Sequence, residues 1–215
     1  MLFLVCFALK EEAAPFRKIA AVKPGIAILI VSIGRQNAER AVREYLAANT
    51  AEMVFTCGFA GGLNSDLKIG EVVFETGNQS GPPYTGCYEK LVAAGAKPVK
   101  FFCADHIATT VAEKKKVREE TGADAVEMES AGIHAECWER GIPCVTVRVI
   151  SDTADEDLPL DFNALAKPDK SLDFGKLAWA IAKSPGKIGA LMDLQKKTSF
   201  AAERLAAVLE KVISP

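Results

Sequence analysis

Acidic and glycine residues follow four apolar runs of this sequence, at positions where α/β proteins usually carry their ligand-binding and catalytic residues. The four positions are residues 11–12, 34–35, 58–62 and 151–152. In open α/β sheets, ligands bind beyond the carboxyl ends of the strands. We therefore expect these segments to gather at one edge of a sheet and to form a site there.

Three carboxylates at or near this edge have the types that acid–base catalysis needs: Glu12, Glu129 and Asp152. A reaction through an oxocarbenium-type transition state needs a protonated acid, an ionised base and an anion that stabilises the cation. Each carboxylate also has a structural interpretation. Glu127 and Glu129 would cap a helix, with one pointing inward and the other toward solvent. Asp152 would be a turn residue, and Glu12 a solvated residue of a first helical turn.

The glycine-rich segment GFAGGL at residues 58–63 is interpreted as a turn after a strand. Gly61 and Gly62 permit close backbone approach to a ligand and positive φ angles. The segment is not GxGxxG and has no Walker lysine, which disfavours dinucleotide and nucleoside triphosphate binding.

Short apolar runs predict the strands that position these residues, because valine- and isoleucine-rich runs are typical of strands buried on both faces. The runs are residues 2–7, 26–33, 53–57 and 144–150, with weaker candidates at 72–75 and 100–103. Helical periodicity predicts helices at 37–48 and 129–140, and residues 78–98 are interpreted as a loop. Strands that alternate with helices indicate an α/β fold with a largely parallel or mixed sheet covered on both sides.

The chain has 215 residues and a net charge of −2, which excludes a disordered or collagen-like protein and disfavours general nucleic-acid binding. We expect one domain over residues 1–215. Six cysteines without a CxxC pair favour reduced thiols and a cytoplasmic protein. The apolar start at residues 1–9 lacks a basic region before it, so we interpret it as a strand and not as a signal peptide.

The stretch from about residue 171 onward is predicted to be helical, with a break at Pro185 and Gly186. Residues 172–197 hold five lysines and two aspartates, a local charge of +3. We expect amphipathic helices packed on the sheet. The alternative is a basic surface that touches a membrane or a lipid-like substrate.

Three segments carry a resemblance to a known family. VEMES and VISD lie within residues 125–161, ALKEEA spans residues 8–13, and GFAGGL spans residues 58–63. Together they resemble the nucleoside phosphorylase and nucleosidase superfamily, in particular the methylthioadenosine/S-adenosylhomocysteine nucleosidases. The resemblance implies a three-layer α/β/α sandwich with a central mixed β-sheet, a homodimer, and hydrolysis of a purine nucleoside to free adenine and a ribose derivative.

The resemblance also implies roles for individual residues. Glu12 would activate the attacking water, Glu129 would hold the ribose hydroxyls, and Met128 would pack on the sugar. Asp152, kept protonated by burial, would donate a proton to the base, and Ser151 would orient Asp152. Further substrate contacts are implied for residues of the glycine segment and of the DHIAT segment: Phe59, Ala60, Gly61, Ile107 and Ala108.

Departures from the family pattern leave alternatives open. Thr56 and Phe59 stand where phosphorolytic members bind phosphate, which favours water as the nucleophile, although Arg35 is a candidate anion ligand for a phosphorylase. The GFAGGL segment and the tail are also similar to a hopanoid-associated branch that releases adenine from an adenosylated lipid. Futalosine-type hydrolases and a non-catalytic nucleoside sensor are further alternatives. No cofactor or metal is predicted, since the two histidines, His106 and His134, lack ligand spacing.

Overall fold

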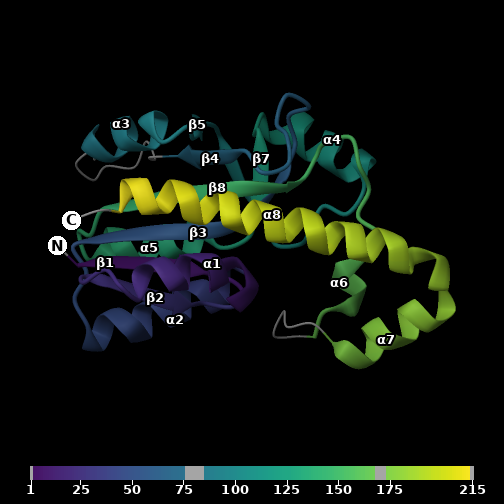
Figure 1. Ribbon diagram of the computed structural model, residues 1–215, viewed down its shortest axis with the longest axis horizontal. Helices are drawn as coiled ribbons and strands as arrows, with labels where there is room; N and C mark the ends of the chain where they lie inside the picture. Colours follow the sequence, from purple (N-terminus) through teal and green to yellow (C-terminus); the bar gives the residue numbers. More distant parts are fainter. Residues whose placement is uncertain (1, 76–84, 168–172, 214–215) are drawn as a thin grey trace.

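The computed structural model describes residues 2–75, 85–167 and 173–213, and its centre is an eight-stranded mixed sheet (Figure 1). Four neighbouring strands run parallel, in the order β2 (Ile26–Ile30), β1 (Phe3–Phe7), β3 (Met53–Gly62) and β8 (Cys144–Asp152). Beyond β8 follow β4 (Val72–Glu75), antiparallel to β8, and β5 (Lys97–Pro98). The end of β3 also pairs with β7 (Ala125–Glu127), which continues to β6 (Phe101–Cys103).

Helices cover both faces of the sheet, which confirms the predicted three-layer sandwich. One face carries α1 (Lys10–Ala20), α3 (Thr85–Ala93) and α8 (Ile188–Val212), and the other carries α2 (Arg35–Ala48) and α5 (Ser130–Glu139). The remaining helices are α4 (Val111–Thr121), α6 (Phe162–Leu165), α7 (Phe174–Lys183) and the 3₁₀ turn η1 (Pro185–Lys187).

Alternation along the strands explains the two apolar cores. Phe3, Val5 and Phe7 of β1 pack toward α1 and α8, whereas Leu4 and Cys6 pack toward α2 and α5. All five side chains are buried, and each large apolar one contributes about 1.5–3 kcal/mol of burial free energy. Because β1 is buried on both faces, none of its positions suits a polar side chain, as its continuous apolar run predicted.

Three elements differ from the predictions. Residues 58–62 continue β3 and do not form a turn, because β8 pairs with one side of this segment and β7 with its end. Residues 151–152 likewise close β8. Residues 85–93 form α3 and not a loop, with Cys87 and Leu91 buried in the core beneath it. The other residues of the predicted loop up to residue 84 lie outside the described part of the chain.

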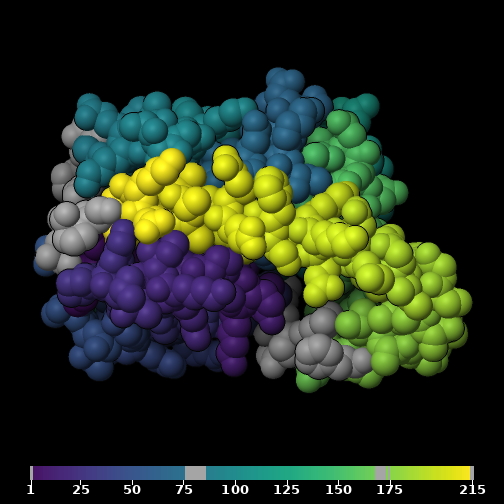
Figure 2. Space-filling view, viewed as in Figure 1, coloured from purple at the N-terminus to yellow at the C-terminus, as the bar shows by residue number. Residues whose placement is uncertain are grey.

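The C-terminal helices divide into a packed and an exposed part. The second half of α8 buries Ala201, Leu205 and Leu209 against α1 and the sheet, as predicted. The C-terminal surface segment (residues 173–197: α7, η1 and the start of α8) instead lies on the surface, where the space-filling view shows it at the lower right (Figure 2). Trp179 in this segment is 61% exposed. In the described part of the chain, no helix is long and apolar enough to cross a membrane.

Candidate active site

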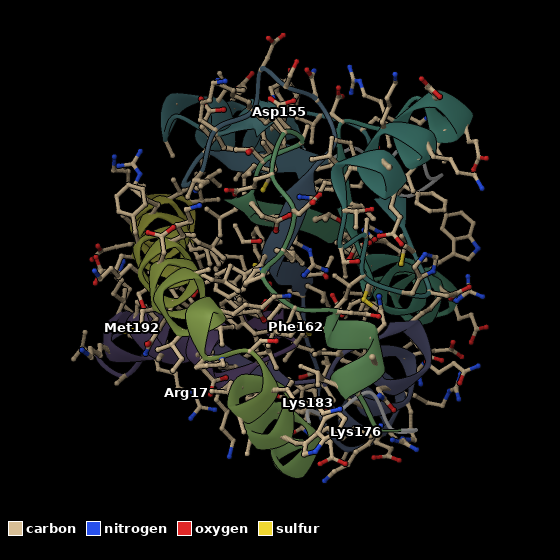
Figure 3. The ribbon with its side chains drawn as sticks, turned by 90° about the vertical axis from the view of Figure 1, so that its right-hand side faces the viewer. Arg17, Asp155, Phe162, Lys176, Lys183 and Met192 are labelled. Carbon is tan, nitrogen blue, oxygen red and sulfur yellow. The ribbon has the colours of Figure 1, made fainter. Side chains whose placement is uncertain are left out.

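The three predicted carboxylates meet at the edge toward which the parallel strands run, the side that faces the viewer in Figure 3. Glu12 lies in the first turn of α1, Glu129 lies between β7 and α5, and Asp152 ends β8. All three are buried. The interpretation of Glu12 as a solvated side chain is therefore wrong. The expectation that either Glu127 or Glu129 faces solvent is also wrong, since both are buried.

Arg148 organises this cluster, and the sequence reasoning missed it. This fully buried residue of β8 forms ion pairs with Glu127 (2.5 Å) and Glu129 (3.3 Å). Its guanidinium also donates to the Thr56 hydroxyl and the Cys57 carbonyl oxygen, each at 3.1 Å. Buried carboxylates need such a cation, because an uncompensated buried charge costs several kcal/mol. The available signal was an arginine inside an otherwise apolar strand.

Glu127 has the capping role that the sequence offered as its structural interpretation. Its carboxylate accepts hydrogen bonds from the backbone N–H groups of Glu129 (2.9 Å) and Ser130 (2.8 Å), and from the Ser130 hydroxyl (2.6 Å). Burial raises its pKa, but the Arg148 charge and these hydrogen bonds outweigh burial and hold the pKa below the usual value. Glu127 is thus ionised at neutral pH, orients Arg148 and caps the start of α5.

Glu129 is held differently. One carboxylate oxygen accepts from the Gly34 backbone N–H (3.0 Å), and the other faces Arg148. Burial, together with the nearby charge of Glu127, raises its pKa to about 7, although Arg148 opposes the shift. A carboxyl group that titrates near neutrality can both donate to and accept from ligand hydroxyls.

Glu12 accepts two backbone hydrogen bonds, from Phe59 (2.9 Å) and from Leu9 (2.8 Å). Burial raises its pKa, while the Phe59 hydrogen bond and the charge of Arg148 lower it. A buried carboxylate with a raised pKa is a better proton acceptor than a solvated one, which suits a general base.

Glycines in β3 make room for these carboxylates. A Cβ atom on Gly58 would lie 2.7 Å from a Glu12 carboxylate oxygen and 2.8 Å from Arg148, and one on Gly61 would lie 3.2 Å from Asp152. The groups that approach Gly58 and Gly61 are thus the protein's own side chains, and the approach of a ligand to Gly61 and Gly62 stays a prediction. The predicted positive φ is found at Gly58 (+145°) and not at Gly61 or Gly62.

Asp152 follows a β-bulge, because Ala60 pairs with Ile150 while Gly61 pairs with Asp152. The Ser151 hydroxyl donates to one Asp152 oxygen (2.7 Å), as expected for an orienting residue. The other oxygen forms an ion pair with Lys114 of α4 (2.6 Å), which the sequence reasoning missed. The prediction that burial keeps Asp152 protonated did not include this cation and stays a prediction.

The remaining predicted residues lie around these carboxylates. Met128 is buried between Glu127 and Glu129, and Phe59 and Ala60 lie in β3 between Gly58 and Gly61. Because three strand residues span about 10 Å, the Glu12 end and the Asp152 end of the site are about that far apart along β3.

The DHIAT segment (residues 105–109) packs against β7 and is also hydrogen-bonded to Asn163, which the sequence reasoning had not singled out. Ala108 is buried in one apolar cluster with Val126, which also lies beside Gly61. The Ile107 N–H donates to the Asn163 side-chain oxygen (2.9 Å), and the Asn163 amide donates back to the Ile107 carbonyl (2.8 Å). The backbone of Ile107 therefore presents an N–H donor beside a carbonyl acceptor, and the Asn163 side chain of α6 is hydrogen-bonded to both.

Two other residues weighed from the sequence have structural surroundings. His134 shares a hydrogen bond with Thr146 (2.8 Å), and burial lowers its pKa, in keeping with the expected structural role. Arg35 begins α2 and is exposed.

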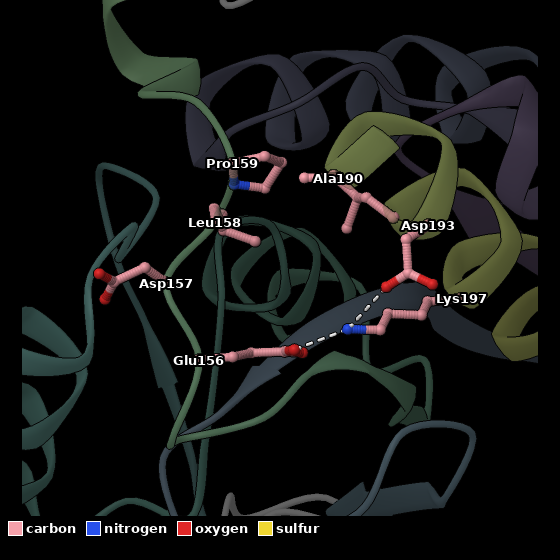
Figure 4. A pocket seen from close by; sticks show the side chains of 8 residues that line it. Glu156, Asp157, Leu158, Pro159, Ala190, Asp193 and Lys197 are labelled. Atoms are coloured by element: carbon pink, nitrogen blue, oxygen red, sulfur yellow. Dashed lines mark hydrogen bonds and ion pairs between the residues drawn. The ribbon is translucent and has the colours of Figure 1, made fainter. Parts of the chain in front are cut away.

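A cavity of about 220 Å³ lies beside the candidate site, between the loop after β8 and the start of α8 (Figure 4). Lys197 bridges the loop and the helix by contacts with Glu156 (2.7 Å) and Asp193 (3.2 Å). None of the predicted site residues lines this cavity, so it is a neighbour of the candidate site and not part of it.

Comparison with known proteins agrees with this architecture. Residues 96–183 match the family model of the phosphorylase superfamily. A 5'-methylthioadenosine/S-adenosylhomocysteine nucleosidase of Exiguobacterium is 29% identical over 74% of this chain and 80% of its own length. A nucleosidase of the same name from Shewanella halifaxensis is 28% identical over 61% of this chain and 70% of its own length.

Solved structures with the same fold include two from Helicobacter pylori. Its futalosine hydrolase has a TM-score of 0.73 at 18% identity, covering 99% of this chain and 97% of that one. Its methylthioadenosine/S-adenosylhomocysteine nucleosidase, solved with butyl-thio-DADMe-Immucillin-A, has a TM-score of 0.73 at 19% identity, covering 99% and 98%. The family match and the curated relatives lead to one conclusion: the chain is similar to the phosphorylase superfamily, and in particular to methylthioadenosine/S-adenosylhomocysteine nucleosidases.

Proposed function

We propose that this protein hydrolyses the N-ribosidic bond of an adenine nucleoside, releasing adenine and a ribose derivative. One observation carries the proposal: Glu12, Glu129 and Asp152 are all buried at one sheet edge, beside a strand whose Gly58 and Gly61 allow Glu12 and Asp152 to lie close to its backbone. A separation of about 10 Å along β3 between the Glu12 and Asp152 ends suits a nucleoside with its sugar at one end and its base at the other.

At the sugar end, Glu12 accepts the proton of the attacking water, and Glu129 binds the ribose hydroxyls. Both carboxylates lie close to the anomeric carbon, where positive charge develops as the C–N bond stretches, and so stabilise it. Arg148 limits their mutual repulsion without neutralising all the negative charge. Met128, next to Glu129, packs on the sugar.

At the base end, Asp152 passes a proton to the departing base while Ser151 holds its orientation. The donor–acceptor pair of Ile107 supports adenine as that base. Asn163 now fills it, and an asparagine amide presents the same pairing of one donor and one acceptor as an adenine edge does. Ala108, Phe59, Ala60 and Gly61 complete the proposed contacts.

Water is favoured over phosphate as the nucleophile. A phosphate dianion would have to enter among buried carboxylates, which repel it. The Thr56 hydroxyl already accepts from Arg148, and that guanidinium is paired with Glu127 and Glu129. The names of the curated relatives support methylthioadenosine or S-adenosylhomocysteine as the first substrates to test.

The experiment is base release from methylthioadenosine, S-adenosylhomocysteine, adenosine and inosine, each with and without phosphate, with the sugar product identified. We expect free adenine and a free ribose derivative at a rate independent of phosphate. Phosphate-dependent release of a sugar phosphate would establish a phosphorylase. Binding without turnover would indicate a nucleoside sensor. Neither binding nor turnover by folded protein would contradict the proposed substrates and direct the search to an adenosylated lipid.

A further inference from the structure

Three consecutive lysines in α4 have different environments. Lys115 and Lys116 are 75% and 74% exposed along their side chains, and each lies 3.9 Å from a glutamate one turn away. The Lys114 side chain is only 1% exposed. Lysines are almost never buried to this extent unless they are paired, so Lys114 calls for a specific explanation.

The Lys114 ammonium has three acceptors. They are a carboxylate oxygen of Asp152 (2.6 Å) and the backbone carbonyl oxygens of Thr153 (2.7 Å) and Glu156 (2.8 Å). An ammonium has three N–H donors, whereas a neutral amine has two and would leave one acceptor unsatisfied. The geometry therefore selects the protonated form of Lys114.

The other charged groups nearby have different partners. The Glu156 carboxylate contacts Lys197 (2.7 Å) and the Thr153 N–H (3.1 Å), so only its backbone carbonyl meets Lys114. The strands beside Asp152 contribute the uncharged Gly61 and Val126. Among the described residues, Asp152 is thus the one carboxylate bonded to Lys114, and Lys114 the one cation bonded to Asp152.

We propose that Lys114 is a positioning residue that supplies, through Asp152, the proton that the departing base takes up. This inference depends on the proposed nucleosidase reaction. It explains how Asp152, which is paired with a cation in the free protein, acts as an acid, because the proton is held one hydrogen bond away on the ammonium.

The proton transfers balance. Lys114 first gives a proton to the Asp152 carboxylate. When the C–N bond breaks, its electron pair remains on the base, which takes that proton from Asp152. Water adds to the anomeric carbon and gives its proton to Glu12. Glu12 then releases that proton to solvent, and Lys114 takes one up, so that each turnover consumes only water.

Two substitutions separate proton supply from charge. Lys114→Met removes both, whereas Lys114→Arg keeps the charge and the donors but cannot give up a proton, since arginine is not deprotonated in proteins. We expect each to lower kcat by about 10²-fold, within the range for general acid catalysis, with a much smaller change in KM. The exposed neighbour provides the matched control, and Lys115→Met should have wild-type kinetics.

The pH profile gives a second readout. Lysine ammonium groups keep their proton to higher pH than carboxylic acids do. In Lys114→Met the activity then depends on the proton of Asp152 itself, so its loss at alkaline pH should begin at least about one pH unit lower than in the wild type. If Lys114 merely kept Asp152 ionised, the loss would move to higher pH instead.

A double-mutant cycle completes the test. If Lys114 acts only through Asp152, Lys114→Met should cause no further loss in an Asp152→Asn background. Fully additive losses, a Lys114→Arg enzyme with wild-type kcat, or a pH limb that is unmoved or raised would overturn the proposal. Full activity of the single variant Asp152→Asn would instead overturn the assignment of Asp152 as the acid in the proposed nucleosidase reaction. Thermal unfolding checks that each variant is folded, and Lys114→Arg carries the test if Lys114→Met is not.

Discussion

The carboxyl edge of the sheet and the C-terminal surface segment use their side chains in opposite ways. At the sheet edge, four carboxylates and two cations are buried: Glu12, Glu127, Glu129, Asp152, Arg148 and Lys114. In the C-terminal surface segment, apolar side chains such as Trp179 and Met192 are exposed. Figure 3 labels Met192 in this segment. Lys183 there stacks on the Trp179 ring at 3.7 Å, with both groups at the surface.

The difference shows where charge matters in this protein. Each buried charge at the sheet edge is tied to partners from other elements, and removing one group leaves its partner uncompensated. Surface charges interact weakly through water, and their loss changes the free energy of unfolding by less than about 1 kcal/mol. Substitutions in the two regions measure this difference.

The largest effect is expected for Arg148→Met, which leaves Glu127 and Glu129 buried without their cation. The free energy of unfolding should fall by about 3–5 kcal/mol in urea titrations. Lys183→Met, which removes a surface cation, is the matched control and should change it by less than about 0.5 kcal/mol. Equal effects of the two substitutions would contradict the contrast.

Gly58→Ala should destabilise the protein by about 2–3 kcal/mol, because it adds a strained backbone conformation to a clash with Glu12 and Arg148. Gly141, which also has a positive φ, has no atom within 4 Å of its Cβ position. Gly141→Ala therefore isolates the backbone cost, and thermal unfolding of the pair measures the clash. Equal destabilisation by Gly58→Ala and Gly141→Ala would show that the contact of the added Cβ atom with Glu12 does not lower the free energy of unfolding.

The raised pKa of Glu129 predicts a pH dependence of stability. Since the folded protein keeps this proton to about pH 7 while the unfolded chain loses it near pH 4.5, folding is increasingly disfavoured as the pH rises between these values. Glu129→Gln removes the titration. Urea unfolding at pH 5 and pH 7 should show a smaller loss of stability in this variant than in the wild type, and an unchanged loss would assign the dependence to another group.

A smaller effect is expected for Asn163→Ala, which frees the donor and acceptor of Ile107 for the base. In the wild type, substrate binding must displace the two hydrogen bonds between Asn163 and Ile107, which contribute about 1 kcal/mol. Without this cost, KM for the preferred nucleoside should fall about five-fold, with kcat little changed. Steady-state kinetics measure it. A raised KM would mean that Asn163 helps to hold the substrate.

The smallest effect on stability is expected for Trp179→Ala, within about 0.5 kcal/mol, because this side chain is already exposed. The same variant tests the alternative of a membrane contact. If the C-terminal surface segment binds lipid, sedimentation with anionic vesicles should weaken in Trp179→Ala, with neutral vesicles as the control. No vesicle binding by the wild type would remove that alternative.

Patterns in the sequence were enough to predict the main strands of the central sheet and the carboxylates that meet at its edge. Buried parallel strands are continuous apolar runs, and the sites of α/β proteins follow their ends, so local pattern was sufficient for β1, β2, β8 and for Glu12 and Asp152. It was not sufficient for β7, whose three residues are too few to show a period.

The pairing of the buried charges depends on how the folded chain brings distant residues together. Arg148 bonds to the Cys57 carbonyl 91 positions away, and Lys114 bonds to Asp152 across 38 positions. No local pattern distinguishes Lys114 from Lys115, because burial depends on which side of α4 meets the loop after β8. A pKa follows from burial and neighbouring charge, which are properties of the folded chain, and so the raised pKa of Glu129 could not be predicted from the sequence.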